Sequence, residues 1–152
     1  MIVYRIQKEK YGNNIQGLGS SFASGRWHLA GGLPILYTAS NSSLAILEVL
    51  AHLPPPYITP PRLILLEIEI PETHVVQIPD IQLPANWNTK GYYKSVQDWG
   101  TDWLQARRSL AISVPSVLSK DRNILINPNH LDFNLVAVAK AHNNFMLDNR
   151  LL

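Results

Sequence analysis

The sequence predicts an α+β domain with a compact mixed or antiparallel β-sheet core and few helices. Two observations lead to this class. Six or seven short strands are expected along the chain, and only one or two helices are expected among them. Eleven prolines is a high number for 152 residues, and those at 54–56 and 60–61 mark a connection between elements that is too short to link two domains. A chain of this length is expected to fold as one domain, residues 1–152.

Most of the strands expected in the first half follow from alternation. Apolar residues at every second position predict a strand at 2–6, and an apolar run predicts another at 34–39, with a polar, glycine-rich loop at 8–25 between them. The clearest strand is 62–70, where one face is entirely apolar and the other carries two glutamates that we expect at the surface. After a Pro-Glu turn, 75–78 is expected to continue that strand.

The second half is expected to begin with a long loop at 79–99, because this segment has aromatic residues and glycine but little periodicity. A helix then starts at Thr101 or Asp102 and reaches Arg107-Arg108, where basic side chains suit the helix dipole. Three short strands complete the chain, at 110–114, 123–126 and 135–139.

The composition excludes several kinds of function. Hydrophobic residues make up 46% of the chain and charged residues 16%, so the chain is not of the disordered class. The net charge of +2 without a basic stripe argues against direct nucleic-acid binding but permits a phosphate-bearing ligand. The absence of cysteine excludes disulfides, thiolate metal sites and a cysteine nucleophile.

Two further expectations concern metals and membranes. His28 and His130 lack the spacing of metal ligands, so we expect no metal site, and His130 should be a hydrogen-bonding residue of its Asn-Pro-Asn-His turn. No apolar run is long enough to span a membrane, and the N-terminus lacks the features of a signal peptide. We therefore expect a cytoplasmic protein with no membrane partner.

The stretch from Gly25 to Glu48 concentrates candidate site residues. It places the guanidinium of Arg26, the phenol of Tyr37 and the carboxylate of Glu48 on three elements around one glycine-rich turn. The helix predicted at 43–52 has Asn41, Ser42 or Ser43 as its N-cap and should be stopped by the prolines at 54–56.

That helix leaves no wide polar face, so we expect it to be buried nearly all round. Glu48 shares a side with Leu44, Leu47 and Ala51, which makes it a buried or cleft-lining acid. Burying an ionised carboxylate costs several kcal/mol unless it is paired. A nearby arginine is the expected partner.

Seven short segments, taken in order, resemble the RES domain, a family named for an Arg, a Glu and a Ser. The segments are Val3-Tyr4-Arg5-Ile6, Gly25-Arg26-Trp27, Leu36-Tyr37, Leu44-Ala45-Ile46-Leu47-Glu48, Ser113-Val114-Pro115-Ser116, 123–130 and 145–151. No single motif is strong, but the ordered set spans almost the whole chain. His28 departs from the family pattern, in which Asn usually follows the Arg-Trp pair.

The resemblance implies the toxin of a bacterial RES-Xre toxin–antitoxin pair with a fold similar to ADP-ribosyltransferases. Members of the family are described as consuming NAD by hydrolysis or phosphorolysis, or as ADP-ribosylating a protein, and as held inactive by an Xre-type antitoxin. It therefore implies NAD as a substrate with no further cofactor, an antitoxin partner and a possible homodimer. Carried over by motif, the implied site is Arg5, Arg26, Tyr37, Glu48 and Ser116.

These residue types suit cleavage of the nicotinamide N-glycosidic bond. The bond breaks through an oxocarbenium-like state, whose positive charge the Glu48 carboxylate can stabilise. Arg5 and Arg26 offer planar forks for the pyrophosphate. Tyr37 can stack on nicotinamide or hold a ribose. Ser116 also fits an ordinary Pro-Ser turn, but it can bond to the nicotinamide amide or to Glu48.

Structural alternatives remain open for these residues. Glu48 can instead reach solvent or His52, one turn later, and Arg26 can pair with Glu48 as structure only. Arg5 can be a surface residue, and Tyr37 in an apolar strand is ordinarily part of the core.

Other functions also remain open. A protein ADP-ribosyltransferase is the alternative within the family, and the acceptor of the ADP-ribosyl group can be water, phosphate or protein. Outside the family, the chain can be a small metal-independent ribonuclease, although it lacks a basic stripe. It can also be a binding module in which Arg26 and Glu48 form a buried pair and the aromatic residues of 87–99 contact a partner.

Overall fold

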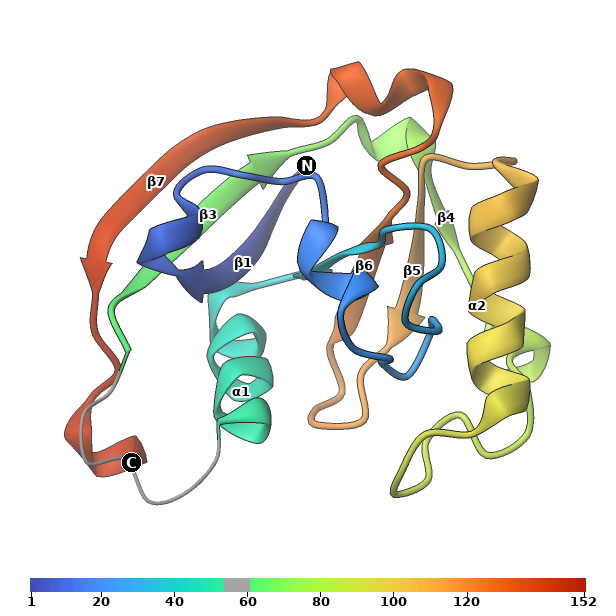
Figure 1. Ribbon diagram of the computed structural model, residues 1–152, viewed down its shortest axis with the longest axis horizontal. Coiled ribbons are helices and arrows are strands. Elements are labelled where there is room, and N and C mark those ends of the chain that lie inside the picture. Colours follow the sequence, from blue (N-terminus) through green and yellow to red (C-terminus); the bar gives the residue numbers. More distant parts are fainter. Residues whose placement is uncertain (54–60) are drawn as a thin grey trace.

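The computed structural model describes residues 1–53 and 61–152, which form one seven-stranded sheet and two α-helices (Figure 1). The strand order is β4-β5-β6-β2-β1-β3-β7, and every neighbouring pair is antiparallel except β4 and β5. The strands are β1 (Ile2–Lys8), β2 (Leu36–Ala39), β3 (Leu63–Glu69), β4 (Val75–Gln77), β5 (Ala111–Pro115), β6 (Arg122–Ile126) and β7 (Ala137–Phe145). The helices are α1 (Ser42–His52) and α2 (Lys94–Ala106). The predicted α+β class with a mixed sheet is confirmed.

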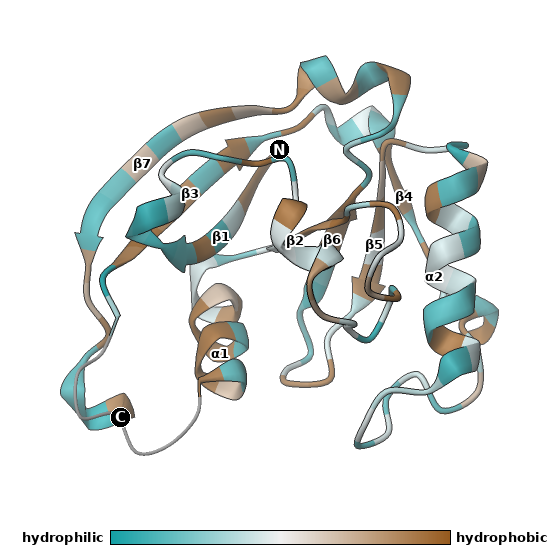
Figure 2. Ribbon diagram, in the orientation of Figure 1, coloured by the Kyte–Doolittle hydropathy of each residue, from teal (hydrophilic) through white to brown (hydrophobic). Residues whose placement is uncertain are grey.

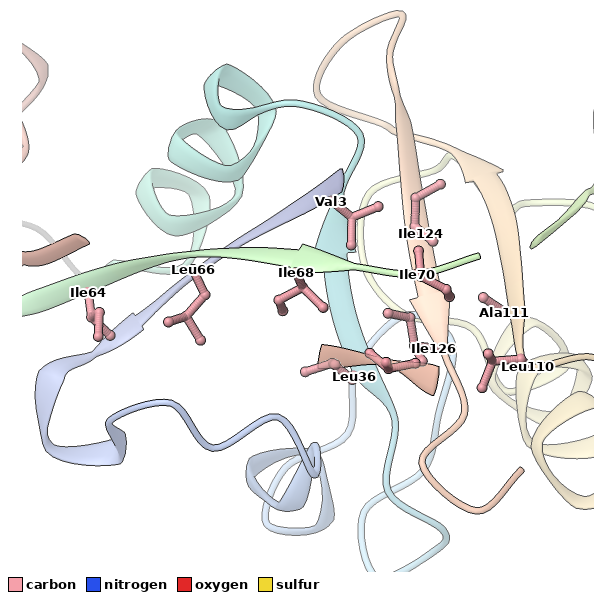
Figure 3. Close-up of a cluster of buried hydrophobic side chains, with 11 residues drawn as sticks. Val3, Leu36, Ile64, Leu66, Ile68, Ile70, Leu110, Ala111, Ile124 and Ile126 are labelled. Atoms are coloured by element: carbon pink, nitrogen blue, oxygen red, sulfur yellow. The ribbon is translucent and has the colours of Figure 1, made fainter. Parts of the chain in front are cut away.

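Apolar side chains of β3 pack into the core from both faces of the sheet, as the alternation along this strand shows. Its even-numbered residues point into one apolar cluster, whereas Leu63 and Leu65 point into another on the opposite face. The first cluster, shown in Figure 3, contains Val3, Leu36, Ile64, Leu66, Ile68, Ile70, Leu110, Ala111, Ile124, Ile126 and Val136. Fully burying one such aliphatic side chain contributes about 1.5–3 kcal/mol, so this cluster is a main source of stability. The two faces predicted for 62–70 are confirmed.

The two helices cover the opposite face at separate places. Leu44 and Ala45 of α1 pack near β1 and β3, whereas Val96 and Leu104 of α2 pack on Ile112 of β5. Figure 1 shows the long connection between β1 and β2 lying between the two helices. Neither described helix has the length and apolar character of a membrane span.

The α1 helix begins as predicted but is less buried than predicted. Asn41 is its N-cap, and its side-chain oxygen accepts the backbone N–H of Leu44 at 2.8 Å. Only Leu44 and Ala45 of the helix are fully buried, and Leu47 is 40% exposed. The prediction of burial nearly all round is wrong, because the helix packs against the sheet along one side only. The stop predicted at 54–56 lies outside the described residues.

The α2 helix begins at Lys94, so the predicted cap at Thr101 or Asp102 is wrong, and the loop predicted at 79–99 ends at Tyr93 instead. A glycine inside a helix costs about 1 kcal/mol relative to alanine, which is why Gly100 concealed the helix in the sequence. The structure uses this glycine for close packing, since a Cβ atom there would lie 1.9 Å from the carbonyl oxygen of Trp27. The helix ends just before the predicted pair of arginines.

Two other strands differ from their prediction. Residues 75–77 do not extend β3 but form β4, which pairs in parallel with β5 at the far end of the sheet. The last strand is 137–145 rather than 135–139, and 131–135 forms a 3₁₀-helix. Hydrophilic residues interrupt β7 along its length (Figure 2), so its sequence lacks the regular alternation that predicts a strand. Its backbone pairing with β3 stabilises the strand instead.

Candidate active site

The sheet opens between β1 and β2. Tyr4 and Ala39 are the one residue pair in register between these strands, whereas β1 pairs with β3 along its whole length. The carbonyl of Tyr37 is left at this opening and accepts a hydrogen bond from Nη1 of Arg5 at 2.8 Å, while Nε of Arg5 donates to Oε1 of Gln7 at 2.8 Å. The Arg5 side chain therefore links β1 to β2 and is not that of a free surface residue. Burial lowers the pKa of its guanidinium, which still stays charged.

A cavity of about 580 Å³ borders this opening, within the usual size range of small-molecule sites. Four of the five predicted site residues line it: Arg5, Arg26, Tyr37 and Glu48. They come from β1, the β1–β2 connection, β2 and α1, so the fold brings together residues on four separate segments. Ser116 is not among the lining residues.

Glu48 is half-buried and is held by an amide, not by a guanidinium. Nδ2 of Asn123, on β6, donates to Oε1 of Glu48 at 2.7 Å. Among residues 1–53 and 61–152, no arginine forms an ion pair with Glu48 within 4.0 Å. The predicted arginine partner is therefore wrong, and so is the structural pair with Arg26. His52 contacts only the main-chain oxygen of Glu48, at 2.7 Å, and not its carboxylate.

Asn123 lines the cavity and was not predicted as a site residue. It lies opposite Ala39 in the β2–β6 register, which places it on the same face of the sheet as Tyr37. Its Oδ1 atom is buried without a hydrogen-bond partner in the described part of the chain. The signal that could have found it is a polar residue at an inward position of an otherwise apolar strand.

Arg26 orders the loop that precedes α2. Its Nη1 donates to the carbonyl oxygens of Trp87 at 2.6 Å and Thr89 at 3.1 Å, and its Cζ lies 5.7 Å from the centre of the Tyr92 ring. Its neighbour Trp27 is 2% exposed and stacks on Trp87, which fixes the backbone at this point. Both hydrogen bonds use Nη1, and the other N–H groups of Arg26 have no hydrogen-bond partner among residues 1–53 and 61–152, so they are available for a ligand.

The hydroxyl of Tyr37 is bonded within the protein. It lies 2.7 Å from Nδ1 of His28 and accepts the backbone N–H of Trp27 at 3.3 Å. His28 is only 4% exposed, and its Nε2 lies 2.7 Å from the carbonyl oxygen of Ser20 and 2.9 Å from that of Ala23. The departure from the family pattern at residue 28 therefore lies inside the site.

Gly25 leaves the space that this pair needs. A Cβ atom at this position would lie 2.7 Å from Cε1 of His28 and 2.9 Å from the hydroxyl oxygen of Tyr37. Its carbonyl accepts Nε2 of Gln97 at 2.9 Å, which ties this segment to α2. The glycine is thus required by its packing against the rings of His28 and Tyr37.

We expect Tyr37 to titrate separately from exposed tyrosines, because burial, above all, raises the pKa of its phenol above the ordinary 10.0. About one pH unit above the ordinary pKa of 10.0, the folded wild type and folded Tyr37→Phe should show equal phenolate absorbance, because Tyr37 is still protonated. In denaturant at the same pH, the wild type should show one phenolate more than the variant. Since the unfolded state ionises first, Tyr37 should make the unfolding free energy fall as the pH rises above 10.0. A larger folded-state signal in the wild type would contradict this prediction.

Within the described ranges, no three potential metal-ligating side chains cluster together. His130 has the structural role predicted for it, since its Nδ1 accepts the backbone N–H of Asp132 at 3.1 Å. This bond closes the turn that leads into the 3₁₀-helix at 131–135.

A mixed sheet that opens beside α1, with two arginines, a tyrosine and a glutamate around one cavity, defines an α+β domain with a candidate ligand site. The profile of the RES domain matches residues 2–148, and the chain belongs to the RES domain family, as predicted.

Three similar proteins cover nearly the whole chain. The Toxin Res of Photorhabdus laumondii is 32% identical over 154 residues, which is 100% of this chain and 97% of that protein. The Toxin Res of Yersinia enterocolitica is 33% identical over 153 residues, 99% of each chain. The Prs ADP-ribosylating toxin of Sphingobium sp. is 30% identical over 145 residues, 92% of this chain and 88% of that protein.

A chain in the crystal structure of the M. tuberculosis MbcT-MbcA toxin-antitoxin complex has a similar structure, with a TM-score of 0.71. The match covers 93% of this chain and 82% of that chain at 13% sequence identity. At this identity the similarity concerns the fold.

Proposed function

We propose that this RES domain is the toxin of a toxin–antitoxin pair and that it consumes NAD by cleaving the nicotinamide N-glycosidic bond. The observation that supports this most is the single cavity lined by Arg5, Arg26, Tyr37 and Glu48. The names of the relatives support it as well, since two are called Toxin Res and the third an ADP-ribosylating toxin. The ADP-ribosyl group of such a reaction comes from NAD.

The charges of the cavity match those of NAD. The pyrophosphate is an anion, and guanidinium groups bind such oxygens with two parallel hydrogen bonds. Arg26 has N–H groups left for this purpose, and Arg5 provides a second cation whose position is fixed by its two bonds within the protein. We therefore assign the pyrophosphate to the side of the cavity that carries these two residues.

Glu48 is assigned to the ribose carbon. As the C–N bond breaks, its electron pair leaves with nicotinamide and positive charge develops on the ribose, where a fixed carboxylate lowers the barrier. The Asn123 amide holds Oε1 and fixes the direction of the carboxylate, while Oε2 has no hydrogen-bond partner among the described residues. That oxygen is available to a ribose hydroxyl.

Ser116 is assigned a supporting position rather than direct contact. Its Oγ accepts the backbone N–H of Leu118 at 3.0 Å, and its neighbours Pro115, Val117 and Leu118 line the cavity in its place. We propose that Ser116 shapes the β5–β6 turn and thereby one wall of the site. In the alternative, a bound ligand draws Ser116 into contact with the nicotinamide amide or Glu48.

Incubation of the purified protein with NAD tests this proposal. We expect release of nicotinamide, and parallel reactions with and without phosphate should show whether ADP-ribose or its phosphate ester is formed. If a protein substrate is needed instead, labelled NAD should modify a protein in a lysate, which is the alternative activity. Degradation of RNA by nuclease-free protein with NAD untouched would overturn the proposal.

We further propose that the protein acts in the cytoplasm, where an Xre-type antitoxin binds it and blocks NAD consumption. The similar fold of a toxin–antitoxin complex chain supports a partner of this kind. Copurification of the antitoxin with loss of nicotinamide release tests this, and light scattering shows whether two copies of the toxin associate.

Tyr92 and Tyr93 provide a matched pair for testing ligand stacking. Their exposed fractions are similar, 48% and 43%, but of the two only Tyr92 lines the cavity and contacts Arg26. Stacking of a base on an aromatic ring is worth about 1–3 kcal/mol, so Tyr92→Ala should raise the KM for NAD about tenfold. Tyr93→Ala should leave KM unchanged, and both variants should unfold at the wild-type temperature. Equal KM values for the two variants would remove Tyr92 from the binding site.

A further inference from the structure

The surroundings of His28 determine which of its ring nitrogens carries the proton. Nε2 lies within hydrogen-bond distance of two carbonyl oxygens, those of Ser20 and Ala23. Carbonyl oxygens only accept hydrogen bonds, so Nε2 must be the donor. In neutral imidazole the other nitrogen is then an acceptor, and the hydroxyl of Tyr37, 2.7 Å from Nδ1, must donate its proton to it.

This arrangement restricts what the Tyr37 hydroxyl can offer to a ligand. A hydroxyl has one proton and two lone pairs. The proton points to His28, and one lone pair accepts the backbone N–H of Trp27. What remains is a single lone pair, so a substrate group that contacts this oxygen must be a hydrogen-bond donor. A phosphate oxygen does not qualify, whereas a ribose hydroxyl or a carboxamide N–H does.

The space beside this oxygen is kept open by the absence of a side chain at residue 25. A Cβ atom there would lie 2.9 Å from the Tyr37 hydroxyl and would also contact the ring of His28. Gly25, His28 and Tyr37 all line the cavity. The hydroxyl is thus held by His28, and Gly25 leaves room beside it.

We propose that His28 is a positioning residue that, by accepting the Tyr37 proton, presents the Tyr37 oxygen as an acceptor to a ribose hydroxyl or the nicotinamide amide of the substrate. This inference rests on the proposed NAD-cleaving function. It also explains why His28 can stand where the family usually has asparagine, because the amide oxygen of an asparagine there would occupy nearly the place of Nδ1.

Two substitutions at residue 28 separate this role from simple loop anchoring. In His28→Asn the amide oxygen can replace Nδ1 as the acceptor for Tyr37, but the bonds to the carbonyls of Ser20 and Ala23 are lost. In His28→Gln the longer amide can still donate to those carbonyls, but the acceptor for Tyr37 is lost. We expect His28→Asn to keep kcat/KM within about threefold of wild type and His28→Gln to lose about tenfold or more. The reverse order would overturn the proposal.

A double-mutant cycle provides a second readout. In a Tyr37→Phe background there is no hydroxyl to orient, so His28→Gln should cause no further loss of kcat/KM. A residue that merely supports the loop would cause the same loss in both backgrounds, which would also overturn the proposal.

Nitrogen-15 NMR of the wild-type histidine rings tests the underlying geometry without NAD. We expect His28 to carry its proton on Nε2 and to show a hydrogen-bonded acceptor signal for Nδ1, and the opposite tautomer would refute the inference whatever the activity. If the wild type releases no nicotinamide while the tautomer is as expected, the proposed function fails and the positioning of Tyr37 stands.

Discussion

Glu48→Gln is expected to reduce nicotinamide release at least about a hundredfold while the protein stays folded, because one preorganised group facing a developing charge is typically worth a factor of 10²–10³. Glutamine keeps the size of the side chain and the Oε1 acceptor for Nδ2 of Asn123. It removes only the negative charge. Since Glu48 is half-buried and forms no ion pair within 4.0 Å among the described residues, we expect the unfolding free energy to change by less than about 1 kcal/mol.

Glu67→Gln is the matched control. The carboxylate of Glu67 is also partly buried and paired, since it lies 2.7 Å from Nε2 of His142, but it does not line the cavity. The substitution changes the net charge by the same amount as Glu48→Gln and should leave nicotinamide release unchanged. Chromatography of the products and thermal unfolding by circular dichroism measure both effects. Full activity of Glu48→Gln, or equal losses in the two variants, would show that the carboxylate of Glu48 does not stabilise the reacting ribose.

The parts of the fold that could be predicted from the sequence are those with a local signal. The strand predicted at 62–70 is found because its alternating apolar residues pack into core clusters on the two faces of the sheet. The predictions fail where distant contacts outweigh local preference. The helix contains Gly100 because the backbone of Trp27 lies too close for a larger residue at this position. The polar residues of β7 form a strand because β3 provides their backbone partners.

The same distinction holds for the candidate site. Arg26, Tyr37 and Glu48 could be predicted because they lie close together in the sequence around one turn, and the structure brings them to one cavity. The contact of Asn123 with Glu48 could not, because it joins residues 75 positions apart and depends on the β2–β6 register. The hydrogen bond from Arg5 to the Tyr37 carbonyl could not be predicted either, because it depends on where β1 and β2 separate, and no local sequence pattern indicates that point.

The α2 helix packs against the segment 25–28, and this contact predicts that a glycine-to-alanine substitution in the helix destabilises the protein. Replacing glycine by alanine inside an exposed helix normally stabilises a protein by about 1 kcal/mol. At Gly100 the added Cβ atom would lie 1.9 Å from the carbonyl oxygen of Trp27, and backbone atoms cannot move aside as a flexible side chain can. We expect Gly100→Ala to destabilise the protein by about 3 kcal/mol and to lower its Tm by about 10 °C, as measured by denaturant and thermal unfolding.

A control on the exposed side of the same helix isolates the steric cause. Ser95→Ala also raises helix propensity, by a smaller amount, at a position where the residue is exposed, and it should leave Tm unchanged or slightly raised. The folded fraction of Gly100→Ala should also release nicotinamide more slowly, because moving α2 away from Trp27 breaks the 2.9 Å bond between Gln97 and the carbonyl of Gly25. A stabilised Gly100→Ala variant would show that α2 does not approach Trp27 this closely. A destabilised variant with wild-type turnover per folded molecule would show that this contact supports the fold without positioning the site.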